Sequence, residues 1–391
     1  MQSALIKEHA KNTCLEKYGV ENWFETETAR NLHKTKCKEL VWKRILSDKM
    51  YSPAFTYDEF LNKNTNSIWK WKCNKCGNIF EALYDNGKHH RCYKCWPNTS
   101  NGTSLSEQQI AEYIKSLIKH EVYNRCMQNK HVLNNKEIDI WIPDLKIAIE
   151  YDGLFYHSEE QGKGKNYHLQ KTEECEKQGI QLIHIFEDEW LDKQKIVKSR
   201  LKHLIVNNER KIFARKCIVK EIDNALKDKF LNKYHIQGKD IAKTRLGLFY
   251  NNHLIAVMTF TKSRFNKKYE YELSRYATIS NFTIIGGAGK LLKYFERNFN
   301  PKSIVTYADR RWSKGNLYFK LGFKLDHIST PNYFYVKNQH RFSRIQFQKH
   351  KLENILENFN PNLSEAQNMK NNGYGKIYDC GNLVFEKTYE K

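Results

Sequence analysis

The feature that most constrains how this chain can fold is a regular spacing of four cysteines. Two C-x2-C pairs, separated by fifteen residues, are made by Cys73, Cys76, Cys92 and Cys95. Four thiolates at this spacing are typical of a tetrahedral structural Zn²⁺ site, which leaves no ligand position for water. Gly77 follows the first pair, where a knuckle turn needs a positive φ. The pattern predicts a zinc ribbon, either a DNA-contacting module or a stapled spacer.

The charge of the chain is strongly basic and unevenly distributed. Lys and Arg number 66 against 44 Asp and Glu, a formal net charge of +22. Residues 1–100 carry +6, residues 101–210 carry −2 and residues 211–391 carry +18. A near-neutral centre between basic flanks suits an acidic catalytic site that acts on a polyanion, so double-stranded DNA is the expected partner. The alternative is that a Lys-rich and Asn-rich composition reflects only an AT-rich genome.

Length and composition predict several globular domains. The chain has 391 residues, of which 40% are hydrophobic and 28% charged, which favours a folded protein over a disordered one. No apolar run approaches the ~18 residues of a membrane-spanning helix, and the first residues lack the apolar core of a secretory signal. The cysteines fit a metal site better than a disulfide framework. We therefore expect a cytoplasmic protein without a membrane partner.

Four segments are expected along the chain: 1–62, 63–100, 101–210 and 211–391. The first segment predicts short helices, and its TCLEKYGVEN resembles a short element found beside many phage-encoded nucleases. That resemblance implies a DNA-contacting module, and a helical hairpin that only packs is the alternative. The clearest boundary is the polar stretch at 98–109, which ends in a helix cap at Ser104 or Ser106.

Residues 133–190 alternate between strand and helix signals. KEIDIWIP and LKIAIEYDGLFYH predict two strands separated by a turn at Pro143-Asp144. KNYHLQKTEECEKQG predicts a helix that stops at Gly179, and IQLIHIFEDEW predicts a further apolar strand. With the helix that follows the linker, these elements predict a small α/β layer.

Two carboxylates on the neighbouring strands form the centre of the candidate site. Asp139 falls in KEIDIW, and Glu150 follows eleven residues later in IAIEYDG. Carboxylates on adjacent strands can converge on Mg²⁺, which polarises a phosphate and prepares a hydroxide for attack. The layout resembles that of PD-(D/E)XK nucleases. Their lysine two residues after the Glu is missing here, and Asp152 takes that place.

Four further side chains are candidates for the same chemistry. His157 can act as an acid or base near pH 7, unless it is simply a buried core histidine. His168 and Lys171 lie three residues apart on the predicted helix and so share a face, although Lys171 could instead be a solvated helix residue. Glu107 opens the preceding helix and could reach the metal through water.

Four stretches within residues 104–190 resemble one nuclease family in the expected order. EIDIWIP, IEYDGLFYH, HLQKT and IHIFEDEW are similar to very-short-patch repair endonucleases, and more so to phage homing endonucleases with a Glu-Asp-x-His-Asp signature. The resemblance implies that Glu107, Asp139 and His157 are the first Glu, Asp and His of that signature. Asp188 is one candidate for the final acidic position of the signature. When the predicted helix is aligned with that of the repair enzymes, His168 falls nearer this position.

The last segment resembles a different family. IGGAGKLL is similar to the pyrophosphate loop of GNAT-type acetyltransferases, in which backbone N–H groups at a helix start bind phosphate, and NLYFKLGFKL is similar to a later segment of that fold. Ile284 or Ile285 stands where the loop usually carries Arg or Gln. The charge of this segment favours a reused fold that binds DNA over an active transferase.

Together these features predict a multidomain α/β protein: a very-short-patch-repair-like PD-(D/E)XK core with an N-terminal zinc ribbon and a C-terminal acetyltransferase-like domain. The expected function is site-specific cleavage of double-stranded DNA, with catalytic Mg²⁺, structural Zn²⁺ and no small-molecule substrate. A repair or restriction nuclease, a nucleic-acid-modifying acyltransferase and a non-enzymatic DNA-binding protein are the alternatives.

Overall fold

The computed structural model describes most of the chain in two compact units, Met1–Leu105 and Ser106–Lys391, which we treat separately. The described residues are 11, 13–17, 20, 26–48, 50–64, 67–84, 92, 94–95, 104–124, 129, 132–133, 136–206, 210–263, 266–337 and 339–389. Four residues of TCLEKYGVEN (18, 19, 21 and 22) and residues 98–103 of the predicted linker lie outside these residues. Within the described ranges, no helix has both the length and the apolar character needed to cross a lipid bilayer.

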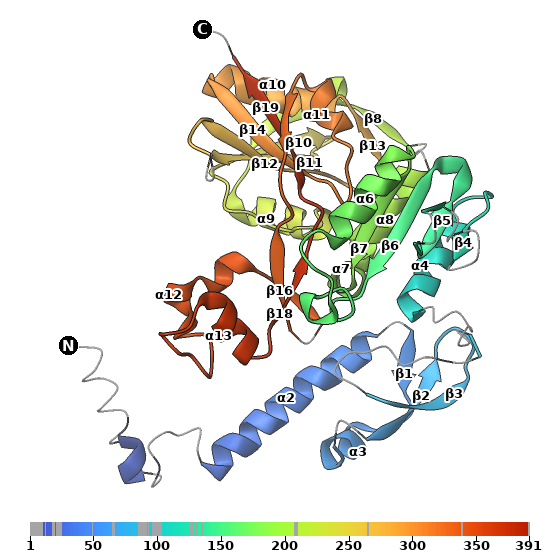
Figure 1. The fold of residues 1–391 in the computed structure, drawn as a ribbon, viewed down its shortest axis with the longest axis vertical. Coiled ribbons are helices and arrows are strands. Elements are labelled where there is room, and N and C mark those ends of the chain that lie inside the picture. The colour runs from blue at the N-terminus through green and yellow to red at the C-terminus, as the bar shows by residue number, and fades with distance from the viewer. Residues whose placement is uncertain are drawn as a thin grey trace. The chain divides into compact units, whose positions relative to one another are not determined.

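The first unit combines a long helix with a small antiparallel sheet (Figure 1). Its elements are α2 (Glu27–Ser47), β1 (Tyr51–Pro53), α3 (Tyr57–Asn62), β2 (Ile68–Cys73) and β3 (Ile79–Leu83). The strands pair in the order β1-β2-β3. Helix α3 begins with a capping box, in which Thr56 and Glu59 bind each other's backbone N–H groups.

An aromatic core joins the helices of this unit to its sheet. Alternate residues of β2 face inward, so Trp69, Trp71 and Cys73 are buried while the residues between them are exposed. Phe60 of α3 and Ile45 of α2 pack into the same cluster. The predicted helical module and the predicted zinc ribbon therefore share one hydrophobic core.

The second unit begins with a four-stranded sheet between helices. Its elements are α4 (Leu105–Lys115), β4 (Tyr123–Asn124), β5 (Ile140–Ile142), β6 (Ile147–Asp152), α6 (Tyr167–Lys177), β7 (Gln181–Phe186), α7 (Glu187–Asp192) and α8 (Gln194–Ile205). The strand order is β4-β5-β6-β7, and only β6 and β7 run parallel. This is the predicted α/β layer with one additional short strand, β4.

Two local predictions for this sheet were wrong. Asp139 precedes β5, which begins at Ile140, so its carboxylate comes from the end of the sheet and not from within a strand. The predicted strand IQLIHIFEDEW ends at Phe186, and Glu187–Asp192 forms helix α7. Acidic residues favour the first turn of a helix, because the positive end of the helix dipole lies there.

The remainder of the second unit is built on a seven-stranded sheet with the order β15-β19-β14-β12-β11-β10-β9. Its strands are β9 (Ile218–Glu221), β10 (Thr244–Tyr250), β11 (His253–Lys262), β12 (Tyr271–Thr278), β14 (Ser303–Asp309), β15 (Lys324–Ile328) and β19 (Asn382–Thr388). The β10–β11 hairpin turns at Asn251 and Asn252, both with positive φ, as the Asn-Asn sequence predicted.

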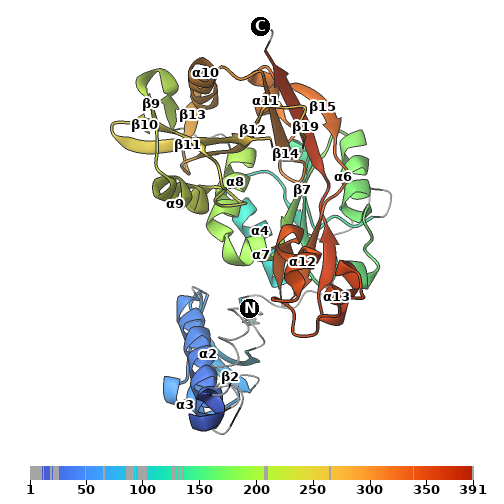
Figure 2. The ribbon, with the colours of Figure 1, turned by 90° about the vertical axis from the view of Figure 1, so that its left-hand side faces the viewer.

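Helices cover both faces of this sheet. Figure 2 shows α10 (Gly287–Phe299) and α9 (Asn224–Tyr234) on opposite sides of it. Neighbouring residues of β11 face opposite ways: Val257 packs with α9, whereas Met258 packs with α10. The smaller elements are β8 (Lys211–Phe213), β13 (Thr283–Ile285), α11 (Asn316–Lys320), β16 (Tyr333–Lys337), β17 (His340–Ser343), α12 (Lys349–Leu352), α13 (Glu365–Asn371) and β18 (Gly375–Tyr378).

Buried ion pairs join helix α7, which follows the four-stranded sheet, to the seven-stranded sheet and to a three-stranded sheet with the order β17-β16-β18. The Arg311 guanidinium, which follows β14, donates to both carboxylate oxygens of Glu189 on α7 at 3.1 Å. Arg341 of β17 also donates to Glu189, at 2.8 Å. The His184 N–H on β7 donates to the carbonyl oxygen of Arg311 at 3.3 Å, which continues the hydrogen bonding beyond the edge of the four-stranded sheet.

Candidate functional site

Strand β6 presents two carboxylates to helix α6. Every residue of β6 is buried, and its side chains alternate between the two faces of the sheet. Ile149 and Tyr151 pack with α4 and α8 on one face, whereas Ala148 packs with Cys175 of α6 on the other. Glu150 and Asp152 share the α6 face with Ala148, so two acidic side chains are turned toward this helix.

The first group on this face consists of Asp139, Glu150 and Lys171, here called the carboxylate–lysine cluster. Extending the antiparallel pairing of β5 and β6 by one residue places Asp139 opposite Glu150. The Asp139 N–H donates to Glu150 Oε1 at 3.3 Å, and the Tyr151 N–H donates to Asp139 Oδ2 at 2.8 Å. Lys171 Nζ lies 2.6 Å from Glu150 Oε1. A lysine from α6 therefore lies against this pair of carboxylates.

The electrostatics of this cluster favour a cation. Burial, and next the nearby Asp139 carboxylate, raise the pKa of Glu150, while the Lys171 ammonium opposes the rise. Burial works against the ammonium of Lys171, but the Glu150 and Asp139 carboxylates outweigh it and raise the pKa of Lys171. Asp139 and Glu150 are only 4% and 3% exposed, so a divalent cation that bound both would relieve their mutual repulsion in a medium that screens charge poorly.

The second group consists of Asp152, His157, His168 and His184, here called the Asp152–histidine cluster. His157 Nδ1 lies 3.1 Å and His168 Nε2 3.4 Å from Asp152 Oδ1, and His184 Nδ1 lies 3.0 Å from Asp152 Oδ2. His157 Nδ1 and His168 Nε2 are themselves 3.0 Å apart. Asp152 and His184 are fully buried.

Charge is unevenly shared in this cluster. Burial alone would raise the pKa of Asp152, but the surrounding imidazoles outweigh it and hold this pKa well below its usual range. Burial lowers the pKa of His184 to about 4. Burial also acts to lower the pKa of His157, but its hydrogen bond to Asp152 outweighs this effect and raises it. The favoured charged pair is therefore Asp152 with His157.

His184 was not identified from the sequence. The available signal was a titratable residue inside the apolar strand IQLIHIF, a placement that is costly without a partner. Parallel pairing of β6 and β7 sets His184 beside Glu150 in the register, on the face that carries Asp152. The sequence does not state which strands become neighbours, and that neighbour relation is what assigns His184 to the cluster.

Two other predicted residues lie elsewhere. Glu107 is in the first turn of α4, on the opposite face of the sheet, where its charge acts on the Tyr151 phenol. Asp188 in α7 pairs with Arg341 of β17 at 3.3 Å and so belongs to the ion pairs that join α7 to the three-stranded sheet. Burial raises the pKa of Asp188, and Arg341 opposes the rise. The structure thus brings Asp139, Glu150, Asp152, His157, His168 and Lys171 to one face of the sheet.

The site reaches solvent at the turn after β6. The His157 and Lys171 side chains are 15% and 11% exposed, in contrast to the buried carboxylates beside them. Phe155 and Tyr156 precede His157 in this turn and are 60% and 73% exposed. Two large aromatic rings therefore project into solvent next to the more accessible members of the site.

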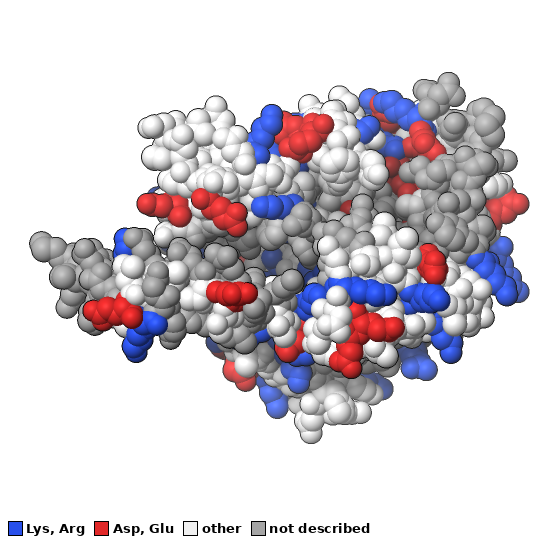
Figure 3. Space-filling view, turned by 90° about the horizontal axis from the view of Figure 1, so that it is seen from below, with Lys and Arg blue, Asp and Glu red and all other residues white. Residues whose placement is uncertain are grey.

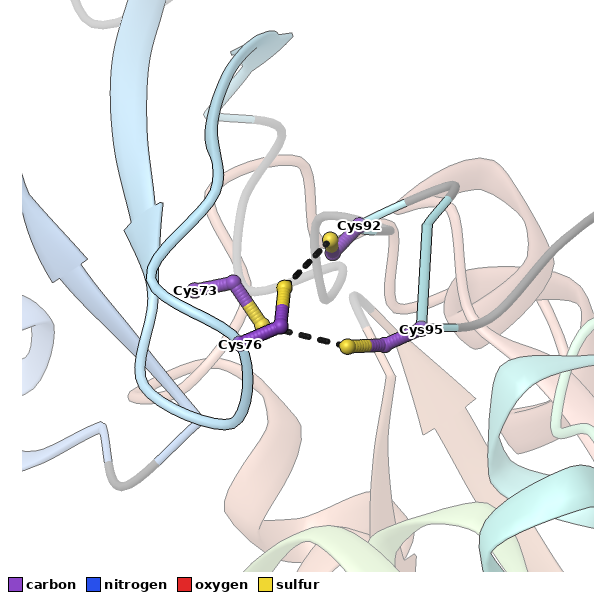
Figure 4. Close-up of side chains that lie close together, drawn as sticks. All are labelled: Cys73, Cys76, Cys92 and Cys95. Carbon is purple, nitrogen blue, oxygen red and sulfur yellow. Dashed lines mark hydrogen bonds between the residues drawn. The ribbon is translucent and has the colours of Figure 1, made fainter.

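The four cysteines of the first unit form a second candidate site. Figure 4 shows their sulfur atoms directed toward one another. The Sγ atoms of Cys73 and Cys95, and those of Cys76 and Cys92, are 3.8 Å apart. A tetrahedron with Zn–S bonds of ~2.3 Å has edges of about 3.8 Å, so this cluster could hold zinc. Gly77 has a φ of +73°, as the knuckle turn predicted.

The surface charge is mixed on the face that Figure 3 shows. Among the described residues in that view, Lys and Arg side chains are interspersed with Asp and Glu side chains. The part of this face where residues are described thus carries alternating charge.

A glycine turn and a cavity lie at the start of α10. Gly286 has a φ of +75° and precedes the helix, as IGGAGKLL predicted. A cavity of about 950 Å³ adjoins this helix, and its lining includes Arg215, Lys293 and Arg297. Lys290 also lines it, but its ammonium donates to the Ala214 carbonyl oxygen at 2.9 Å.

No family model and no curated protein matches this chain. Among solved structures, a GNAT-family acetyltransferase from Bacillus cereus aligns at 13% identity with a TM-score of 0.24, over 45% of this chain and 99% of that protein. A GNAT-family acetyltransferase from Elizabethkingia anophelis, solved with acetyl-CoA bound, aligns at 15% identity with a TM-score of 0.24, over 44% of this chain and 99% of that protein. TM-scores at this level assign no fold to the chain.

Proposed function

We propose that this protein is a metal-dependent DNA endonuclease that uses the carboxylate–lysine cluster. The observation that carries the proposal is the convergence of Asp139 and Glu150 at the end of the four-stranded sheet, with Lys171 against Glu150 at 2.6 Å. Two carboxylates and one lysine are the side chains that a PD-(D/E)XK centre needs. The expectation that Lys171 would help in catalysis gains support from its contact with Glu150.

Asp139 and Glu150 would hold Mg²⁺, because carboxylate oxygens are the ligands that this hard cation prefers. When bound, the ion supplies Lewis-acid activation of the scissile phosphate and lowers the pKa of a coordinated water. Lys171 would contact the phosphate and offset its negative charge. The backbone N–H of Tyr151 fixes the orientation of the Asp139 carboxylate at 2.8 Å, so this ligand is held in place before metal binds.

His157 would act as the general acid or base beside this centre. Its Nδ1 donates to Asp152 Oδ1 at 3.1 Å, which leaves Nε2 for proton transfer and fixes the ring orientation. Asp152 is fully buried and acts through His157 as a positioning residue. This arrangement gives a role to Asp152, which stands where PD-(D/E)XK nucleases carry their lysine.

Double-stranded DNA is the proposed substrate. The net charge of +22 favours a polyanion. The exposed rings of Phe155 and Tyr156 lie next to His157 and could pack against bases or sugars at the cut site. The modular arrangement, with four cysteines that we propose bind a structural Zn²⁺, supports a site-specific enzyme of the homing type, because linked modules lengthen the footprint on DNA. A repair or restriction nuclease on the same core is the alternative.

Plasmid cleavage with Mg²⁺ tests the proposal, together with a gel-shift assay in EDTA. Asp139→Asn should lower the cleavage rate by about a hundredfold or more, since it removes stabilisation of charge in the transition state, and should leave DNA binding intact. Asp144→Asn is the matched control, because Asp144 lies nearby on the surface and pairs only with His120 among the described residues. Cleavage by Asp139→Asn at the wild-type rate would exclude this centre.

A second candidate function is acyl transfer. The glycine turn at Gly286 and the cavity beside α10 favour a phosphate-bearing cofactor, since backbone N–H groups at a helix start bind phosphate. The capture of Lys290 by the Ala214 carbonyl, and Ile285 before the turn, weigh against it. Calorimetric titration with acetyl-coenzyme A distinguishes the two: binding supports a transferase, and no binding supports a fold reused for DNA.

A further inference from the structure

The proposed nuclease leaves two buried histidines without a role. His168 and His184 are 2% and 0% exposed, and both face the fully buried Asp152. Titratable side chains in a protein interior are costly unless they are paired or coordinate a metal. Hydrogen bonding within the Asp152–histidine cluster helps to distinguish simple pairing of these side chains from coordination of a metal.

The hydrogen bonds of Thr172 favour one tautomer of His184. The Thr172 hydroxyl donates to the carbonyl oxygen of His168, one helical turn earlier, at 2.9 Å. Cys380 Sγ, 3.2 Å from Thr172 Oγ1, is a second acceptor for the same proton. With the proton directed to either of these two acceptors, Thr172 Oγ1 can only accept from His184 Nε2, 3.0 Å away. With the proton on Nε2, neutral His184 presents the lone pair of Nδ1 to Asp152 Oδ2 at 3.0 Å. A lone pair facing a carboxylate oxygen is repulsive unless a cation lies between them.

His168 is in a similar position. Its Nε2 lies 3.0 Å from His157 Nδ1, and both nitrogens are near Asp152 Oδ1. If His157 Nδ1 donates to Asp152, a second proton on His168 Nε2 would set two N–H groups against each other. His168 Nε2 therefore also presents a lone pair toward Asp152.

The distances suit a coordination sphere. One ligand atom from each of Asp152, His168 and His184 lies within 4.8 Å of the other two. Asp152 Oδ1 lies 3.4 Å from His168 Nε2 and 3.4 Å from His184 Nδ1. Ligand atoms around a tetrahedral ion with bonds of ~2.1 Å are about 3.4 Å apart. The outer hydrogen bond from His184 Nε2 to Thr172 is the kind of contact that orients metal-binding imidazoles.

We propose that Asp152, His168 and His184 bind a transition-metal ion of the Zn²⁺ class. Two imidazole nitrogens and one carboxylate oxygen favour such an ion over Mg²⁺. The three ligands come from β6, α6 and β7, so the ion ties the helix to two neighbouring strands. This site is separate from the four cysteines and from the carboxylate–lysine cluster, and it does not depend on nuclease activity.

Elemental analysis of the full-length protein, purified without metal-affinity resin, tests the proposal. Three variants are compared with the wild type: Cys76→Ser, His184→Gln and His253→Gln. His253 lies exposed at the β10–β11 turn in the same unit and serves as the matched control. We expect His184→Gln to lose one equivalent of metal. His253→Gln should keep the wild-type metal content. Cys76→Ser should keep the metal that is bound by Asp152, His168 and His184.

X-ray absorption on the metal retained by Cys76→Ser identifies its ligands and does not require the His184 variant to fold. Nitrogen and oxygen ligands without sulfur support the site, whereas a sulfur shell places the metal at the remaining cysteines and overturns it. A Cys76→Ser protein without metal, or a folded His184→Gln protein with unchanged metal content, also overturns it. Those results would mean a metal-free cluster in which the Thr172 hydroxyl donates to His184 Nε2 and the Nδ1–H of neutral His184 donates to Asp152.

Discussion

The cysteine site of the first unit and the carboxylate site of the second are assembled in different ways. The four cysteines lie within 23 residues of each other, and their spacing alone indicates what they do. Asp139, Glu150 and Lys171 come from the end of one strand, the middle of another and a helix, and only packing brings them together. A site formed by neighbouring residues can thus be predicted from their spacing in the sequence. A site formed by tertiary structure depends instead on the contacts that position the helix on the sheet.

The largest effect should follow loss of the local site. Cys73→Ser removes one of four thiolates, and because a structural zinc site contributes directly to folding, we expect one zinc per chain to be lost and residues 69–97 to unfold. Circular dichroism of the second unit's helices should be unchanged, and Cys217→Ser, a buried cysteine in that unit, is the control. Wild-type protein without zinc would contradict the assignment.

A smaller effect should follow loss of the ion pair between Arg311 and Glu189, which connects the seven-stranded sheet to helix α7. In Arg311→Met, Glu189 keeps only Arg341 of its two arginine partners. Asp309, the second carboxylate that pairs with Arg311, loses this guanidinium. Breaking a buried ion pair typically costs about 3–5 kcal/mol. The free energy of unfolding of the second unit, from urea denaturation, should fall by roughly that amount.

Lys262→Met is the control for this measurement. Lys262 pairs with Glu270 on the surface and its side chain is 67% exposed, so its loss should cost under about 1 kcal/mol. Equal destabilisation by the two variants would show that the ion pair between Arg311 and Glu189 contributes no more than a surface pair.

Low pH should weaken the ion pairs that Glu189 forms with Arg311 and Arg341. Burial would raise the pKa of Glu189, but Arg311 and Arg341 outweigh it and lower this pKa to about 2. Because the folded-state pKa lies below the unfolded value of about 4.5, the contribution is complete above pH 4.5 and is lost as the pH falls toward 2. The shift corresponds to about 3 kcal/mol.

Unfolding free energies between pH 6 and pH 3 check this expectation against Glu189→Gln. Asp188, whose pKa is raised by burial and further by the Glu189 charge, acts in the opposite sense, so the difference between the two proteins reports Glu189 together with its effect on Asp188. Parallel pH profiles for the two proteins would contradict the role of Glu189.

The same contrast explains how much could be predicted from sequence. The alternation in β6 placed Glu150 and Asp152 on one face, and the three-residue spacing of His168 and Lys171 placed both on one face of α6. These are periodicities of a single element. The cysteine spacing and the positive φ of Gly77 are equally local.

What could not be predicted depends on long-range packing. The pairing of Lys171 with Glu150 depends on how α6 crosses the sheet. His184 joins the Asp152–histidine cluster only because its strand, β7, pairs in parallel with β6. Asp188 was a candidate acid because IHIFEDEW resembles the nuclease family, but its carboxylate pairs with Arg341, which lies 153 residues later in the chain. The start of β5 after Asp139 likewise reflects pairing with β6 and not a local preference.

The most direct test of the central claim is a double-variant cycle on Glu150 and Lys171. Cleavage rates with Mg²⁺ are measured for wild type, Glu150→Gln, Lys171→Met and the double variant, with Lys163→Met, a lysine in the turn before α6, as control. Residues that act as one catalytic unit lose activity non-additively. We expect each single variant to be slower by about a hundredfold and the double variant to be no slower than the slower single variant. Losses that multiply in the double variant, or wild-type cleavage by either single variant, would contradict a shared catalytic centre.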